Sequence, residues 1–131
     1  MDMSIYLNTD AGRLLSLMTG WWTEFMHMRS NLQVTRINLG NFIKALDEFD
    51  CDDMTRGYIG VIKSELTVSD IMNTRFPSNS IAHIINVAHS VLTLVLLKPS
   101  SDISLSAPEC EYRDALEDTE LYKFYSIKEE N

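Results

Sequence analysis

The chain has 131 residues, of which 45% are hydrophobic and 23% are charged, and its formal net charge is −8. This length corresponds to one domain, large enough to bury a core without disulfides or metals. An acidic chain without a basic stripe disfavours binding to nucleic acid and to anionic membrane surfaces, because both depend on cations that neutralise phosphates. These two classes of partner are therefore not expected.

The composition also bears on fold class and compartment. Five Gly and three Pro are few for an all-β chain of this length and favour helices. Cys51 and Cys110 stand far apart, without a CxxC pair, which is typical of a reducing compartment. Residues 1–9 lack a basic segment leading into an apolar run, so no signal peptide is expected. The sequence thus predicts a cytoplasmic protein.

The first half of the chain has the apolar spacing of amphipathic helices. Helices are expected over residues 10–30, 39–49 and about 53–65. Thr67 followed by Asp70 resembles a capping box and predicts a short further helix ending near Arg75. Trp21 and Trp22 are adjacent and point about 100° apart on a helix, so both cannot lie equally deep in one core.

The stretch from Phe76 to Leu97 contains no formal charge and is long enough to span a bilayer. Its polar residues nevertheless recur at helical spacing and form one narrow stripe; they are His83, Asn86, Ser90 and Thr93. Pro77 opens the segment, as a proline does in the first turn of a soluble helix. We therefore expect a core helix over about residues 80–97 rather than a membrane span.

A flexible linker is expected at about residues 98–108, followed by one last helix over about residues 109–125. Ile103 and Leu105 alternate with serines and are also compatible with a short strand. The complete prediction is one all-α domain over residues 1–131, with five or six helices around the central apolar helix.

Acidic residues concentrate in two segments, since residues 41–66 carry −3 and residues 99–131 carry −6. The residues proposed to bind a partner are Asp47, Glu48, Asp50, Asp52 and Asp53 in the first segment and Glu111, Asp114, Glu117, Asp118 and the nearby Tyr122 in the second. A solvated surface explains such clusters adequately. The functional alternative is a docking surface that attracts a basic protein and accelerates association.

No pattern of catalytic residues is present, so neither an enzyme nor a cofactor is expected. The cluster of Asp50, Asp52 and Asp53 lacks the Gly and Glu that a calcium loop needs at its sixth and twelfth positions. His83 and His89 are six residues apart and so do not face one metal ion. No metal site is expected either.

The run Phe42, Ala45, Leu46, Asp47, Glu48, Phe49 resembles the BH3 segment of the Bcl-2 family. An amphipathic helix followed by a long apolar helix is also similar to the Bcl-2 fold. This resemblance implies a protein that binds an amphipathic helix of a host protein in an apolar groove. The run departs from the BH3 pattern at Leu46, where the family has a small residue, and it covers fewer than ten residues. We make no family assignment on it.

The sequence thus predicts a non-enzymatic, protein-binding module. The most concrete form is an acidic inhibitor, such as an immunity protein that neutralises a basic toxin or nuclease by occlusion. The alternatives are a Bcl-2-like regulator with an apolar groove and a structural subunit of an assembly. The sequence leaves open the oligomeric state and whether the two acidic segments form one surface.

Overall fold

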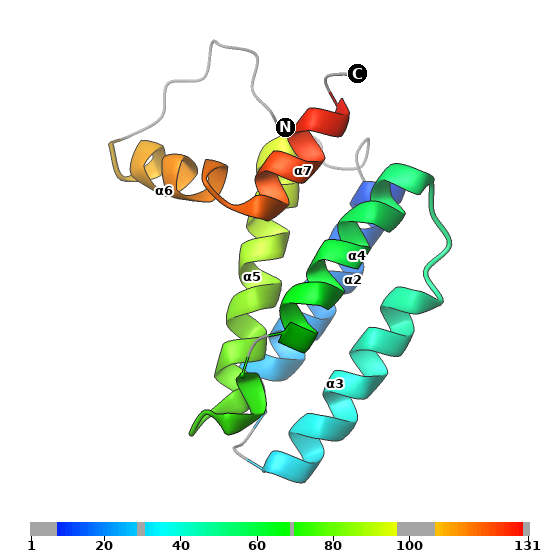
Figure 1. Ribbon diagram of the computed structural model, residues 1–131, viewed down its shortest axis with the longest axis vertical. Helices are drawn as coiled ribbons and strands as arrows, with labels where there is room; N and C mark the ends of the chain where they lie inside the picture. The colour runs from blue at the N-terminus through cyan, green and yellow to red at the C-terminus, as the bar shows by residue number, and fades with distance from the viewer. Residues whose placement is uncertain (1–7, 29–30, 69, 97–106, 130–131) are drawn as a thin grey trace.

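The computed structural model describes residues 8–28, 31–68, 70–96 and 107–129 (Figure 1). These residues form helices and no strand. The helices are α2 (Asp10–His27), α3 (Leu32–Asp47), α4 (Asp53–Val68), the 3-10 helix η1 (Ile71–Asn73), α5 (Pro77–Leu96), α6 (Ala107–Glu117) and α7 (Glu120–Glu129). The all-α prediction is confirmed. The linker expected at about residues 98–108, including its alternative as a strand, falls mainly outside the described residues.

Helix α5 lies at the centre and contacts all the other described helices. Its most extensive contact is with α2, which runs antiparallel to it (Figure 1). Apolar side chains on one face of α5 are fully buried in the core; they include Ile81, Ile85, Ala88 and Leu92. Burial of such side chains is the main favourable term in folding. The prediction of a central apolar helix is therefore confirmed.

Length and composition alone would also allow Pro77–Leu96 to cross a membrane. The core helix of a soluble protein has the same length and composition, so this property does not separate the two cases. In this structure the apolar face of α5 is occupied by contacts within the bundle.

Side chains at the helix starts explain where α2 and α3 begin. The hydroxyl of Thr9 accepts a hydrogen bond from the backbone N–H of Gly12, at 3.0 Å. The side chain of Asn31 accepts from the N–H groups of Gln33 and Val34, both at 3.1 Å. Each bond satisfies an N–H group that has no partner within its helix. Helix α3 therefore begins seven residues before the predicted start.

Two further predicted boundaries are wrong. Thr67 does not open a new helix, because α4 continues to Val68 and the Thr67 hydroxyl donates to the Ser64 carbonyl within its last turn. The expected single C-terminal helix is divided into α6 and α7. At the break, the backbone N–H of Thr119 donates to Leu116, and the Thr119 hydroxyl accepts from the N–H of Tyr122. Thr119 thereby ends one helix and caps the next.

Two aromatic groups connect the outer helices to the core. Trp21 on α2 lies 5.4 Å from Phe42 on α3, measured between ring centroids, and also packs on Phe25. Tyr58 on α4 packs edge-to-face against Tyr125 on α7, and its hydroxyl donates to the carbonyl of Ala88 in α5. These contacts fix α3 and α7 against the bundle.

Candidate protein-binding surfaces

The first acidic segment is the connection between α3 and α4, which we call the acidic loop (residues 47–53). Two arginines hold its backbone. Arg13 of α2 donates to the carbonyl of Asp50 at 3.0 Å, and Arg56 of α4 donates to the carbonyl of Asp47 at 3.4 Å and to that of the preceding Leu46 at 2.8 Å. The Arg13 guanidinium also lies over the Phe49 ring, 5.4 Å from its centroid. The loop is therefore held in one conformation from both sides.

Some of the predicted binding residues have structural roles in this loop. The Asp52 side chain accepts from the N–H of Thr55 at 2.8 Å and so caps α4. The carboxylate of Asp47 is paired with Lys63. The backbone N–H of Asp52 donates to Asp10, and the hydrogen bonds from Arg13 and from this N–H lower the pKa of the Asp10 carboxyl. Neither Asp47 nor Asp52 is thus fully available to a partner.

The other three loop carboxylates, those of Glu48, Asp50 and Asp53, are exposed. Within the part of the chain that the structure describes, no ion pair joins any of them to a basic residue. Cys51 lies between them and is half-buried, and burial raises the pKa of its thiol. A raised pKa keeps the thiol protonated, so it is a poor nucleophile. The chemistry offered by the loop is a fixed set of negative charges.

The second acidic segment includes α6 and the break before α7. Glu111, Asp114 and Asp118 are exposed, whereas Glu117 is half-buried. The guanidinium of Arg113 lies 3.5 Å from a carboxylate oxygen of Asp114 and 3.8 Å from one of Glu117. Part of the negative charge of α6 is therefore compensated within the helix. Tyr122 on α7 is half-buried and packs against the core, which makes most of its ring unavailable to a partner.

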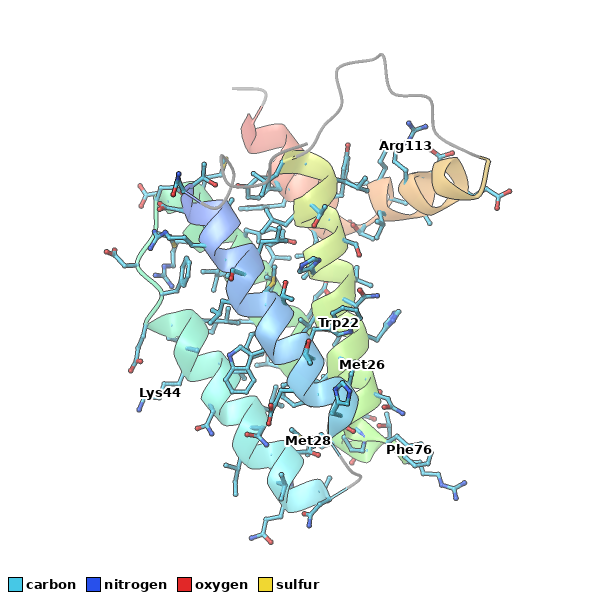
Figure 2. All side chains as sticks on the ribbon, turned by 180° about the vertical axis from the view of Figure 1, so that it is seen from behind. Trp22, Met26, Met28, Lys44, Phe76 and Arg113 are labelled. Carbon is cyan, nitrogen blue, oxygen red and sulfur yellow. The ribbon has the colours of Figure 1, made fainter. Side chains whose placement is uncertain are left out.

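The two acidic segments lie on opposite sides of the bundle. Figure 1 shows α6 on one side of α5 and the α3–α4 connection on the other, with α2 and α4 between them. Figure 2 shows the same separation from behind, with Arg113 of α6 far from Lys44 near the end of α3. The structure therefore does not join the predicted binding residues into one surface, and a compact partner meets one segment at a time.

No family model matches this chain. A search of curated proteins and one of solved structures also find no match. The run that resembles a BH3 segment spans the last turns of α3 and the first residues after it; Phe42 and Leu46 are fully buried and Phe49 is half-buried. As folded, its apolar side chains are part of the core and are not presented to a groove on another protein.

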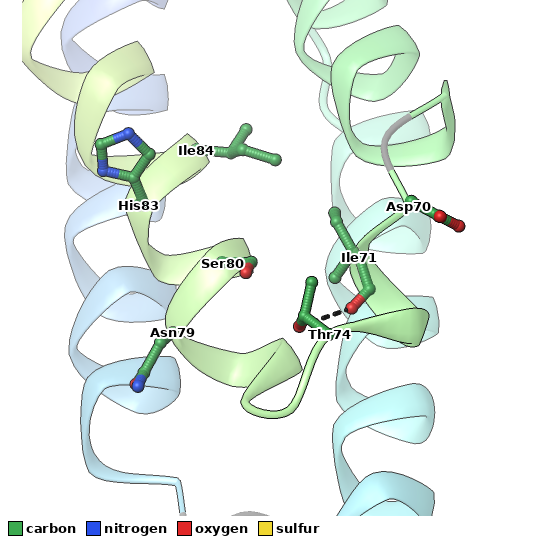
Figure 3. Close-up of a pocket in the computed structure, with 7 residues that line it drawn as sticks. All are labelled: Asp70, Ile71, Thr74, Asn79, Ser80, His83 and Ile84. Atoms are coloured by element: carbon green, nitrogen blue, oxygen red, sulfur yellow. Dashed lines mark hydrogen bonds between the residues drawn. The ribbon is translucent and has the colours of Figure 1, made fainter.

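Two pockets lie elsewhere on the surface. One, of about 450 Å³, lies between η1 and the first turns of α5. Figure 3 shows Ile71 and Ile84 pointing toward one another there, while the side chains of Asp70 and His83 point away from the gap. The pocket therefore has apolar walls and no pair of converging titratable groups. The second, of about 380 Å³, lies between α2 and α3.

Sequence reasoning missed the residues that hold the acidic loop in place. Arg13 and Asp10 are about 40 positions away from the loop residues they bind, and no local pattern signals such a contact. It also missed the exposed apolar residues of α3, Val34 and Ile37, whose side chains are 43% and 59% exposed. Their spacing of three residues on one helix face was the available signal.

Proposed function

We propose that this protein is a non-enzymatic binding module whose acidic loop captures a basic protein and blocks it by occlusion. The observation that carries the proposal is the way the loop is built. Arg13 and Arg56 bind its backbone carbonyls and leave the carboxylates of Glu48, Asp50 and Asp53 in solvent. A rigid anionic surface loses little conformational freedom on binding, and its field steers a cationic partner toward it.

The experiment compares two variants that remove the same number of charges. One replaces the loop carboxylates (Glu48→Gln, Asp50→Asn, Asp53→Asn), and the other replaces three on α6 (Glu111→Gln, Asp114→Asn, Asp118→Asn). Each immobilised protein is exposed to an extract of the source cells at low and at high salt, and the retained proteins are identified by mass spectrometry. Because both variants change net charge equally, a difference between them reports location.

We expect a basic protein that binds the parent and the α6 variant, is lost from the loop variant, and elutes as salt rises, since screening weakens exposed charge pairs. Addition of the parent should then inhibit the activity of the purified partner. A partner retained equally by both variants, or one that binds without losing activity, would contradict occlusion by the acidic loop.

A further inference from the structure

The guanidinium of Arg13 lies close enough to the acidic loop to cancel one of its charges. It is always positively charged, and its Nη2 donates to the backbone carbonyl of Asp50 at 3.0 Å. The carboxylate of Asp50 is attached to the same Cα and is the stronger acceptor, because it is ionised. A rotation of side chains would therefore let Arg13 pair with this carboxylate. Among the residues that the structure describes, however, Arg13 forms its ion pair with Asp10 instead.

The carboxylate of Asp10 holds both Arg13 and the loop. Asp10 precedes Arg13 by three residues in α2, so the two side chains lie on one face of the helix. Oδ1 of Asp10 accepts from Nη2 of Arg13, and Oδ2 accepts from the backbone N–H of Asp52 at 2.8 Å. These two hydrogen bonds lower the pKa of the Asp10 carboxyl. Asp10 is therefore ionised at neutral pH and retains the charge that binds Arg13.

The pair of Asp10 and Arg13 fixes the loop without using the charges of the loop. Arg13 contributes a donor to the loop backbone and a cation over the Phe49 ring, and Asp10 compensates the positive charge. The other arginine, Arg56, is also directed to the backbone, because it donates to two carbonyls at the end of α3. The last carbonyls of a helix have no partner within it. Both cations beside the loop thus bind carbonyl oxygens.

We propose that Asp10 is a positioning residue of the acidic loop, which holds Arg13 on the loop backbone and so keeps the carboxylate of Asp50 available to a cationic partner. The inference rests on the proposed function, since an available carboxylate matters only if the loop binds a basic protein. When residue 10 carries no charge, Arg13 pairs with Asp50 and neutralises it, although no residue of the loop has changed.

Titration of the full chain with a short polylysine peptide at low salt tests this role, followed by NMR through the backbone amide signals of the loop. The decisive variant is Asp10→Asn, because asparagine keeps an oxygen that accepts from the Asp52 N–H but has no charge to hold Arg13. Asp50→Asn is then compared with Glu48→Gln in the parent and in the Asp10→Asn background. Each of these two substitutions removes one exposed carboxylate of the loop.

We expect a different response from the two loop carboxylates. In the parent background, Asp50→Asn and Glu48→Gln should each weaken peptide binding about twofold, as for one exposed charge pair. In the Asp10→Asn background, Asp50→Asn should have no further effect, whereas Glu48→Gln should still weaken binding about twofold. Adding Arg13→Gln to Asp10→Asn should restore the effect of Asp50→Asn, because no cation is then left to cover this carboxylate.

Three outcomes overturn the proposal. The first is an equal loss from Asp50→Asn in all three backgrounds, which would mean that the charges act additively. The second is a parent whose loop amides do not respond to the peptide. The third is rapid hydrogen exchange of the Asp52 N–H in Asp10→Asn, which would show that Asp10 holds the loop itself and not the side chain of Arg13. None of these measurements needs the natural partner, so capture of a basic protein from a cell extract is decided independently.

Discussion

His89 occupies a half-buried site between α5 and α2. Its Nε2 lies 2.8 Å from the hydroxyl oxygen of Thr19, and that hydroxyl donates its one hydrogen to the carbonyl of Leu15. With the hydroxyl hydrogen on Leu15, the neutral ring that fits this contact carries its hydrogen on Nε2 and donates to Thr19. Burial lowers the pKa of His89 below its usual 6.5, so the folded protein favours the neutral ring.

This site makes stability depend on pH. As the pH falls below about 6.5, the unfolded chain protonates at His89 while the folded chain does not, so the free energy of unfolding decreases until the lowered pKa is reached. We expect the parent to lose stability relative to His89→Gln between neutral pH and about pH 5.5, since glutamine keeps an N–H donor and does not titrate. Urea unfolding at the two pH values measures the difference.

The same comparison with His83→Gln provides the control, because His83 is exposed on the same helix. A parent whose stability changes with pH in parallel with that of His89→Gln would show that burial at this site does not lower the pKa of His89.

At the scale of elements, the contact between α4 and α7 includes a close approach of Phe124 to Gly57. A Cβ at Gly57 would lie 2.6 Å from Cζ of Phe124, whereas one at Gly60 would meet nothing within 4 Å. Alanine is favoured over glycine inside a helix by about 1 kcal/mol. Gly60→Ala should therefore stabilise the protein by about that amount, and Gly57→Ala should fall short of it or destabilise, because the Phe124 ring must move.

Chemical denaturation of the two variants gives the comparison directly. In a Phe124→Ala background the obstruction is removed, and both substitutions should then stabilise by similar amounts. An equal gain at both glycines in the parent background would mean that α7 does not rest on α4 at this point.

A helix could be predicted from the sequence where the spacing of its own apolar and polar side chains indicates it. The position of α5 is predictable because 22 consecutive uncharged residues with polar residues at helical spacing predict one long helix. The first turns of α3 were missed because Leu32, Val34 and Ile37 are exposed and do not follow the spacing of a core face. The break between α6 and α7 depends on the single side chain of Thr119.

The candidate site was predictable in composition and not in arrangement. The acidic residues are visible in the sequence, but the sequence does not show which of their carboxylates are already bound to other groups of the protein. Asp52 caps α4 through a local bond to Thr55, three residues on, whereas Asp47 pairs with Lys63, a role that depends on how α4 is placed relative to α3. The separation of the two acidic segments is likewise set by the packing of α5 between them, which no local pattern encodes.

At the scale of the whole molecule, that separation has a measurable consequence. The Debye length is about 10 Å at 0.1 M salt, and charges further apart than this are largely screened from one another. The acidic loop and α6 lie on opposite sides of the bundle (Figure 1), so the field of one segment should contribute little at the other.

We therefore expect the effects of the two triple substitutions on stability to be additive. The change in the free energy of unfolding for the protein with all six substitutions should equal the sum for the loop variant and the α6 variant to within about 0.5 kcal/mol, as for distant independent sites. Urea unfolding at about 0.1 M salt measures all four proteins. A larger coupling that disappears at high salt would mean that the two segments share one field, in which case substitutions on α6 should also slow capture of a basic partner by the acidic loop.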